Sequence, residues 1–202
     1  MNELAPEIGR LTLEHLNLVA WACGGAMLVG IALGVLVSRW SAGRPWIVGA
    51  AGVLQTIPGL ALLGFLIPVT GIGAGTATVA LFLYALLPIV QNTVTGILEV
   101  DQTVRESAVA MGMTPAQILR EVEMPLAWPT ILGGIRIALV TSIGTATIAA
   151  AVGGGGLGVL IFRGVATLDT RQILAGALPA ALLALLFEGV LQWFEKRLAA
   201  SR

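Results

Sequence analysis

Charged and aromatic side chains are scarce in this chain of 202 residues. Only 11% of the residues are charged and 5% are aromatic, whereas 57% are hydrophobic. Soluble globular domains carry about 25% charged residues. The scarcity of charge therefore excludes an ordinary soluble domain and indicates an integral membrane protein. The formal net charge is zero, so the charge balance does not favour a nucleic acid as a partner.

The residues of common catalytic sites are equally scarce. Cys23 and His15 are each the only residue of their type, so the chain has no Cys or His cluster that could bind a metal. The G-x-x-x-x-G-K-[ST] phosphate loop is absent, and no serine stands in a nucleophile elbow. Gly153, Gly155 and Gly158 match G-x-G-x-x-G, but they follow a predicted membrane span and not a strand. We expect an outer turn there, and an intramembrane serine hydrolase is only a remote alternative.

Five hydrophobic runs are long enough to cross a bilayer as helices, since about 20 mostly apolar residues suffice for one span. They cover residues 16–37, 46–67, 74–98, 130–152 and 173–194. Apolar residues are continuous in these runs and do not alternate with polar ones, which favours helices over barrel strands. We therefore expect one all-α membrane domain, 1–202, with a single large polar loop at about residues 99–128.

The distribution of basic residues predicts the orientation. Arg39 and Arg44 follow the first span, Arg105 and Arg120 follow the third, and the segment after the fifth span is also basic. Lys and Arg are enriched in cytoplasmic loops. The N-terminus is therefore expected outside and the C-terminus in the cytoplasm, although two arginines in the last outer loop weaken this count.

The polar loop predicts two short helices. Asp101 is placed to cap the first helix, and Gly112 is placed to end it. Thr114 and Gln117 have the spacing of a capping box at the start of the second helix, and Pro125 is expected to stop that helix. The pair has too few apolar residues to form a core of its own. We therefore expect it to dock on a partner protein.

This loop resembles the coupling motif of bacterial ABC importer permeases, written EAA, three residues, Gly, nine residues, Ile-x-Leu-Pro. The residues that stand at its spacing are Glu106, Ser107, Ala108, Gly112, Val122 and Pro125. Ser107, Val122 and Met124 depart conservatively from the family pattern. The segments 54–63, 153–164 and 173–182 are similar to glycine betaine, carnitine and choline permeases, and the resemblance covers about residues 16–198.

The resemblance implies a five-transmembrane-helix type I ABC importer permease, with two coupling helices that dock on a cytoplasmic ABC ATPase dimer. This chain would bind no cofactor and catalyse no reaction, because ATP and Mg²⁺ would be held by the ATPase. It would lie in the bacterial inner membrane with a second permease subunit, identical or homologous, and receive osmoprotectants of the glycine betaine type from an extracytoplasmic binding protein. A five-helix amino-acid importer permease is the alternative within this class. An ATP-independent channel would leave the coupling motif unexplained.

Polar residues inside three spans are candidates for the transport path. Broken helices at mid-membrane often border a transport site, and the second span is interrupted near its middle. Pro88 frees a carbonyl in the third span that needs another partner. The candidates are Gln55, Thr56, Pro58, Asn92, Thr141, Ser142 and Thr145. Hydrogen bonding between helices is an equally open role for them.

Two charged residues lie inside predicted spans. At 1.5 Å per residue, Arg136 in the fourth span and Glu188 in the fifth are both about 10 to 12 Å from the inner boundary. An unpaired charge at membrane depth costs at least about 2.5 kcal/mol. We therefore predict that the two side chains face each other, and a structural role is favoured over a role in transport.

Overall fold

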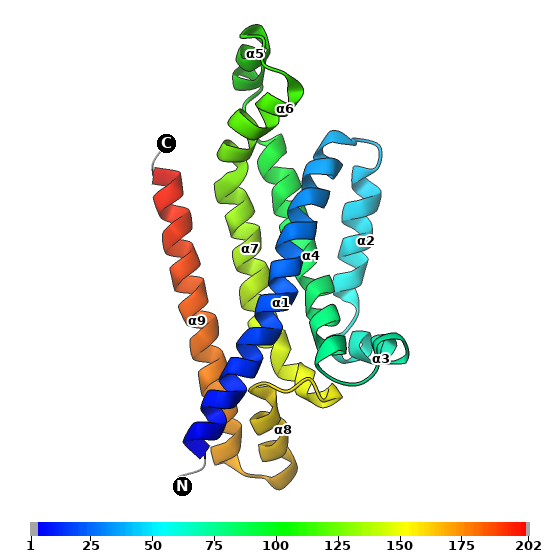
Figure 1. Cartoon of the computed structure of the whole chain (residues 1–202), viewed down its shortest axis with the longest axis vertical. Coiled ribbons are helices and arrows are strands. Elements are labelled where there is room, and N and C mark those ends of the chain that lie inside the picture. The colour runs from blue at the N-terminus through cyan, green and yellow to red at the C-terminus, as the bar shows by residue number, and fades with distance from the viewer. Residues whose placement is uncertain (1–3, 201–202) are drawn as a thin grey trace.

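The computed structural model describes residues 4–200 as a bundle of helices (Figure 1). Residues 1–3 and 201–202 of the predicted domain lie outside the described residues. Four helical stretches are long and apolar enough to cross a membrane, and a bent pair supplies a fifth candidate span. The four are α1 (Leu4–Arg39), α4 (Ala74–Leu98), the stretch Pro115–Val152 that contains α7 (Met124–Ala146), and α9 (Thr170–Ala200). The predicted all-α membrane fold is confirmed.

The bent pair corresponds to the predicted second span. Its two helices, α2 (Arg44–Thr56) and α3 (Gly59–Thr70), meet at an angle of 102°. The predicted interruption is confirmed, because the break falls at Ile57 and Pro58. With 13 residues, α2 alone is about 20 Å long at 1.5 Å per residue, which is shorter than the hydrocarbon core of a bilayer.

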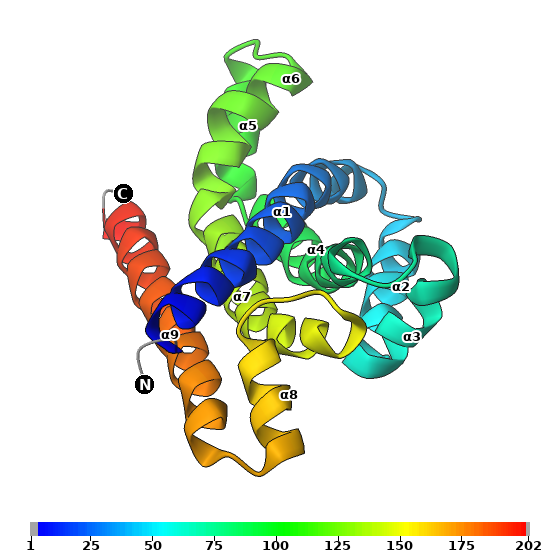
Figure 2. The same cartoon turned by 60° about the horizontal axis from the view of Figure 1, so that its bottom comes forward.

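The centre of the bundle is α4, which packs along both α1 and α7. Small residues permit this close approach. A Cβ added at Gly34 would lie 2.4 Å from the Cβ of Thr93, and one added at Gly134 would lie 2.6 Å from the carbonyl oxygen of Pro88. Both glycines face one stretch of α4, residues 88–93, so larger residues there would separate α1 and α7 from it. By contrast, α9 lies at the edge of the bundle (Figure 2) and exposes many of its leucines.

The ends of the first coupling helix are those that the sequence predicts. Asp101 caps α5 (Gln102–Ala110), because its side chain accepts a hydrogen bond of 2.8 Å from the backbone N–H of Thr103. Gly112 follows with φ of 80°, a conformation that glycine adopts without a Cβ penalty. Thr114 and Gln117 form the predicted capping box at the start of α6 (Pro115–Gln117).

The prediction that Pro125 ends the second helix is wrong. After α6, the chain continues through the π-helical segment η1 (Ile118–Glu123) directly into α7. Proline disrupts a helix interior through its missing N–H and its clash with the carbonyl four residues earlier, but it is tolerated in a first turn. Pro125 lies in the first turn of α7, and the wider π-turn before it changes the local hydrogen-bonding pattern. The coupling segment is therefore continuous with a membrane span.

The opposite end of the bundle is closed by short elements. The 3₁₀ segment η2 (Thr147–Val152) extends α7, and a glycine turn leads to α8 (Gly158–Thr167). Gly153, Gly155 and Gly156 all have positive φ in this turn, as expected for a turn and not for a nucleotide-binding helix start. The N-terminal end of α1 lies beside α8, whereas α5, α6 and the C-terminal end of α9 lie at the other end (Figure 1).

Candidate functional site

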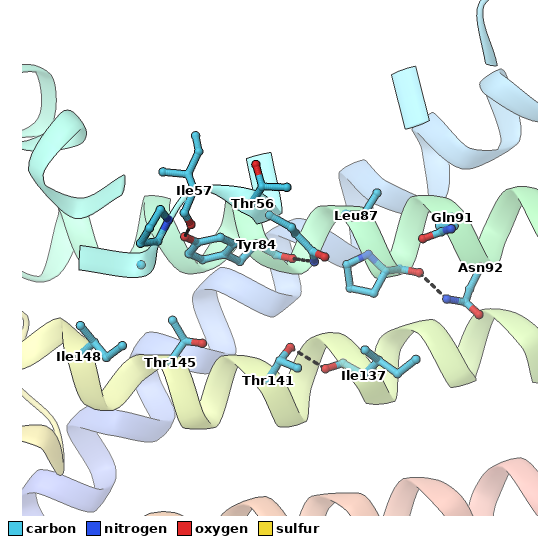
Figure 3. A pocket seen from close by; sticks show the side chains of 14 residues that line it. Thr56, Ile57, Tyr84, Leu87, Gln91, Asn92, Ile137, Thr141, Thr145 and Ile148 are labelled. Atoms are coloured by element: carbon cyan, nitrogen blue, oxygen red, sulfur yellow. Dashed lines mark hydrogen bonds between the residues drawn. The ribbon is translucent and has the colours of Figure 1, made fainter. Parts of the chain in front are cut away.

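A cleft of about 560 Å³ lies between the α2–α3 break, α4 and α7 (Figure 3). Six of the seven predicted path residues line it: Gln55, Thr56, Pro58, Asn92, Thr141 and Thr145. None of the described residues that line the cleft is charged. The lining therefore consists of amides, hydroxyls, one tyrosine ring and apolar groups. It can contact a small polar solute, but it offers no charged group that would favour solutes of one charge.

Ser142 is not part of this cleft. Its side chain is buried in the helix packing, with 2% exposed, and it lies on a different face of α7 from Thr141 and Thr145. Successive helical residues are rotated by about 100°, whereas residues four apart share a face. Thr141 and Thr145 can therefore both line the cleft while Ser142 points elsewhere.

Two hydrogen bonds running in opposite directions connect the α2–α3 break to α4 (Figure 3). The carbonyl freed by Pro88 is that of Tyr84, four residues earlier. The side-chain amide of Gln55 donates to this carbonyl at 3.1 Å, and the Tyr84 hydroxyl donates to the carbonyl of Ile57 in the break. The partner that the third span requires is therefore Gln55. Tyr84 was missed as a site residue, although the spacing from Pro88 identifies its carbonyl.

Asn92 and Thr141 bond within their own helices. The Asn92 side-chain amide donates to the carbonyl of Pro88 at 2.8 Å, and the Thr141 hydroxyl donates to the carbonyl of Ile137 at 2.6 Å. Both residues also line the cleft. Neither bond joins two helices, so these two residues line the cleft without the interhelical hydrogen bonding that the sequence left open.

The coupling residues project beyond the end of the membrane helices (Figure 1). Glu106 and Ser107 are exposed, and Ala108 is buried against the rest of the segment. Glu106 accepts a hydrogen bond of 2.8 Å from Gln102. Val109 and Met111 beside them are also exposed. Residues 102–111, called the coupling tip, therefore present a carboxylate next to apolar side chains, a combination suited to docking.

The remaining motif residues lie nearer the bundle. Val122 is half-buried in η1 and Pro125 is exposed at the start of α7. Together with Gly112 in the turn after α5, they connect α5 to a membrane helix. Displacement of α5 can therefore act directly on α7.

Arg136 contacts Glu188, as its depth predicts, and also a second carboxylate. Arg136 Nη1 lies 2.5 Å from Glu188 Oε1, and Arg136 Nε lies 3.1 Å from Glu195 Oε2. Glu195 was missed. It lies seven residues after Glu188, so the two carboxylates share one face of α9. The group therefore holds one more negative than positive charge.

A family model described as "Binding-protein-dependent transport system inner membrane component" matches residues 26–200. The chain is 49% identical over 175 residues to the glycine betaine/carnitine/choline transport system permease protein OpuCD of Bacillus subtilis, covering 86% of this chain and 76% of that protein. It is 45% identical over 203 residues to the osmoprotectant import permease protein OsmW of Salmonella typhimurium, covering 98% of this chain and 93% of that protein.

Two solved structures share the fold. An inward-facing conformation of the MetNI methionine ABC transporter superposes with a TM-score of 0.83 at 24% identity, covering 92% of this chain and 93% of that one. An amino acid ABC transporter crystallised with histidines gives a TM-score of 0.80 at 22% identity, covering 98% and 96% of the two chains.

Proposed function

This chain belongs to the family of binding-protein-dependent transport system inner membrane components, and on that premise we propose that it transports osmoprotectants of the glycine betaine, choline and carnitine type. It is a multi-pass inner-membrane transport subunit and not a catalytic subunit. A component of this kind works with an ATPase and a solute-binding protein. The proposed solutes are those named for relatives with 45 to 49% identity over most of the chain.

The observation that carries the proposal is the uncharged cleft at the α2–α3 break. Glycine betaine and carnitine, unlike choline, have no net charge, so a path of amides and hydroxyls can admit these two without a charged partner. A quaternary ammonium group is usually held tightly by stacked aromatic rings, and among the described residues that line the cleft only Tyr84 is aromatic. Selection is therefore assigned to the binding protein, and the permease provides a path of low affinity.

The proposed assembly contains a second permease subunit, identical or homologous, because the cleft is not enclosed by a single chain. The α5 tips of both subunits dock on a cytoplasmic ATPase dimer. On this proposal the α5 end of the bundle is cytoplasmic, together with the C-terminal end of α9, and the N-terminal end of α1 at the opposite end faces outside. ATP binding closes the dimer, moves both tips and shifts the bundle from inward-facing to outward-facing.

An amino-acid importer is the second candidate, because the two solved structures compared above come from amino-acid transporters. Reconstitution of the permease with its ATPase and binding protein in liposomes separates the two. We expect ATP-dependent uptake of radiolabelled glycine betaine, carnitine or choline, abolished when EDTA removes Mg²⁺ from the ATPase. Uptake of methionine or histidine alone would replace the proposal with the second candidate. Equal uptake without ATP would reject both in favour of a channel.

A further inference from the structure

Glu123 is the only acidic side chain that is buried among residues 4–200, with 1% of its surface exposed. It occupies the position that the Ile-x-Leu-Pro pattern leaves open, so the motif assigns it no role. A buried carboxylate is costly unless it is paired and hydrogen-bonded. The residues that pair with Glu123 therefore indicate its role.

Two arginines from different elements surround this carboxylate. Arg39, the last residue of α1, donates to both of its oxygens, with Nη1 at 3.3 Å from Oε1. Arg105 of α5 places its Nε 3.3 Å from the same Oε1. Arg105 also donates through Nη2 to the carbonyl of Ile97 in the last turn of α4. The Glu123 cluster, consisting of Arg39, Arg105 and Glu123, thus joins the ends of α1 and α4 to α5 and to the start of α7.

The cluster is the main polar attachment of α5 to the bundle. Within α5 only Ala108 is buried, and a single alanine gives little apolar contact with the neighbouring helices. The helix has nine residues, too few to be stable in isolation. Without the carboxylate, the two guanidinium groups would face each other without a counter-charge, and α5 would lose its connection to α1.

We propose that Glu123 is the positioning residue that transmits displacement of α5 to α1, α4 and α7. The inference rests on the proposed ATPase-driven transport, and it assigns the transmission step to a residue outside the recognised motif. Because a paired and buried carboxylate fixes both arginines, α5 moves together with the membrane helices. Loss of the charge breaks the link from α5 to α1 and leaves the bond of Arg105 to Ile97 and the chain connection to α7, so less of the displacement of α5 reaches the bundle.

The test compares Glu123→Gln with Glu121→Gln in the reconstituted complex. Glu121 lies two residues earlier in the same π-helical segment and is exposed, so it is a matched control. The readout is the number of solute molecules imported per ATP hydrolysed. We expect this ratio to fall about tenfold in Glu123→Gln, within the usual range of coupling between two sites, and to stay unchanged in Glu121→Gln. Glu123→Asp retains the charge and should recover part of the ratio.

A merely structural role would lower the amount of assembled complex. The complexes that still assemble would then import the same number of solute molecules per ATP as the wild type, and that result would overturn the proposal. If Glu123→Gln does not assemble, Arg39→Gln decides, because Arg39 is half-exposed and its loss leaves Glu123 paired with Arg105. An unchanged ratio in Arg39→Gln overturns the proposal, and a reduced ratio supports it. The wild-type complex is measured first, so absence of ATP-driven uptake there counts against the proposed function and is distinct from a failure of Glu123.

Discussion

Removal of Arg136 should destabilise the membrane domain more than removal of either of its carboxylate partners. Orphaning one member of a fully buried ion pair costs about 3 to 5 kcal/mol. Here the side chains of Arg136, Glu188 and Glu195 are 23%, 39% and 30% exposed, so part of the penalty is relieved by solvent or lipid headgroups. We therefore expect Arg136→Gln to cost roughly 2 to 3 kcal/mol, because it leaves two carboxylates facing each other.

The second carboxylate lowers the cost of losing the first. In Glu188→Gln the guanidinium keeps its ion pair with Glu195, so the expected loss is only about 1 kcal/mol, the value of one charge-assisted hydrogen bond in a partly exposed site. The double variant of Arg136 and Glu188 retains a single unpaired carboxylate, next to the basic C-terminal end of α9. Its loss should be smaller than the sum of the two single losses by about 1 kcal/mol or more.

The assay is chemical unfolding in nanodiscs for the wild type, both single variants and the double variant, analysed as a thermodynamic cycle. Glu195→Gln serves as the matched single variant on the same face of α9. Equal losses for Arg136→Gln and Glu188→Gln would refute the role of Glu195 as a second partner. Strictly additive losses would refute the interaction between Arg136 and Glu188.

Three further outcomes follow from local geometry. Gly112 has φ of 80° with open space around an added Cβ, so Gly112→Asp costs about 1 kcal/mol through backbone strain alone. Gly112→Asp and Glu106→Lys should leave the amount of permease in the membrane unchanged but reduce the ATP hydrolysis that the binding protein stimulates. Normal stimulation in both variants would contradict docking through α5. Tyr84→Phe removes the hydroxyl bonded to the α2–α3 break, so stability should fall by about 1 kcal/mol and uptake should slow, whereas unchanged uptake would show that the bond has no role in transport. The side-chain hydrogen bond from Gln172 lowers the pKa of Asp169 below its usual 3.8. The stability that Asp169 confers on the start of α9 is therefore complete above pH 3.8 and is lost as the pH falls through the depressed pKa, and an NMR titration midpoint above 3.8 would contradict this.

Features set by local sequence were predictable, and those set by contacts between distant helices were not. The hydrophobic runs and the caps at Asp101 and Thr114 depend only on neighbouring residues, and the structure agrees with them. The break at Pro58 was also predictable, but its angle of 102° was not. That angle depends on how Gln55 and Tyr84 join the break to α4, across 29 residues of sequence.

Two differences between the sequence predictions and the structure have a helical explanation. Ser142 was grouped with Thr141 and Thr145 by residue type, although helical periodicity already separates positions four apart from their neighbours. Pro125 was taken as a helix end because the π-turn before it leaves no composition signal. Glu123 was overlooked because an acidic residue in a polar loop is normally solvated, and only the fold shows that two arginines enclose it.

On the proposed mechanism, α4 is the element through which movement of the coupling tip reaches the cleft. Its last turn is attached to α5 through the carbonyl of Ile97 and Arg105, and its middle is attached to the α2–α3 break through Tyr84. The two attachments are 13 residues apart, about 20 Å along a helix at 1.5 Å per residue. Within this length, Gly34 and Gly134 leave residues 88–93 of α4 in close contact with α1 and α7, so α4 moves together with its neighbours. Because the carbonyl freed by Pro88 is satisfied from outside the helix, displacement of α4 must alter the hydrogen bond from Gln55, and with it the position of the break that lines the cleft.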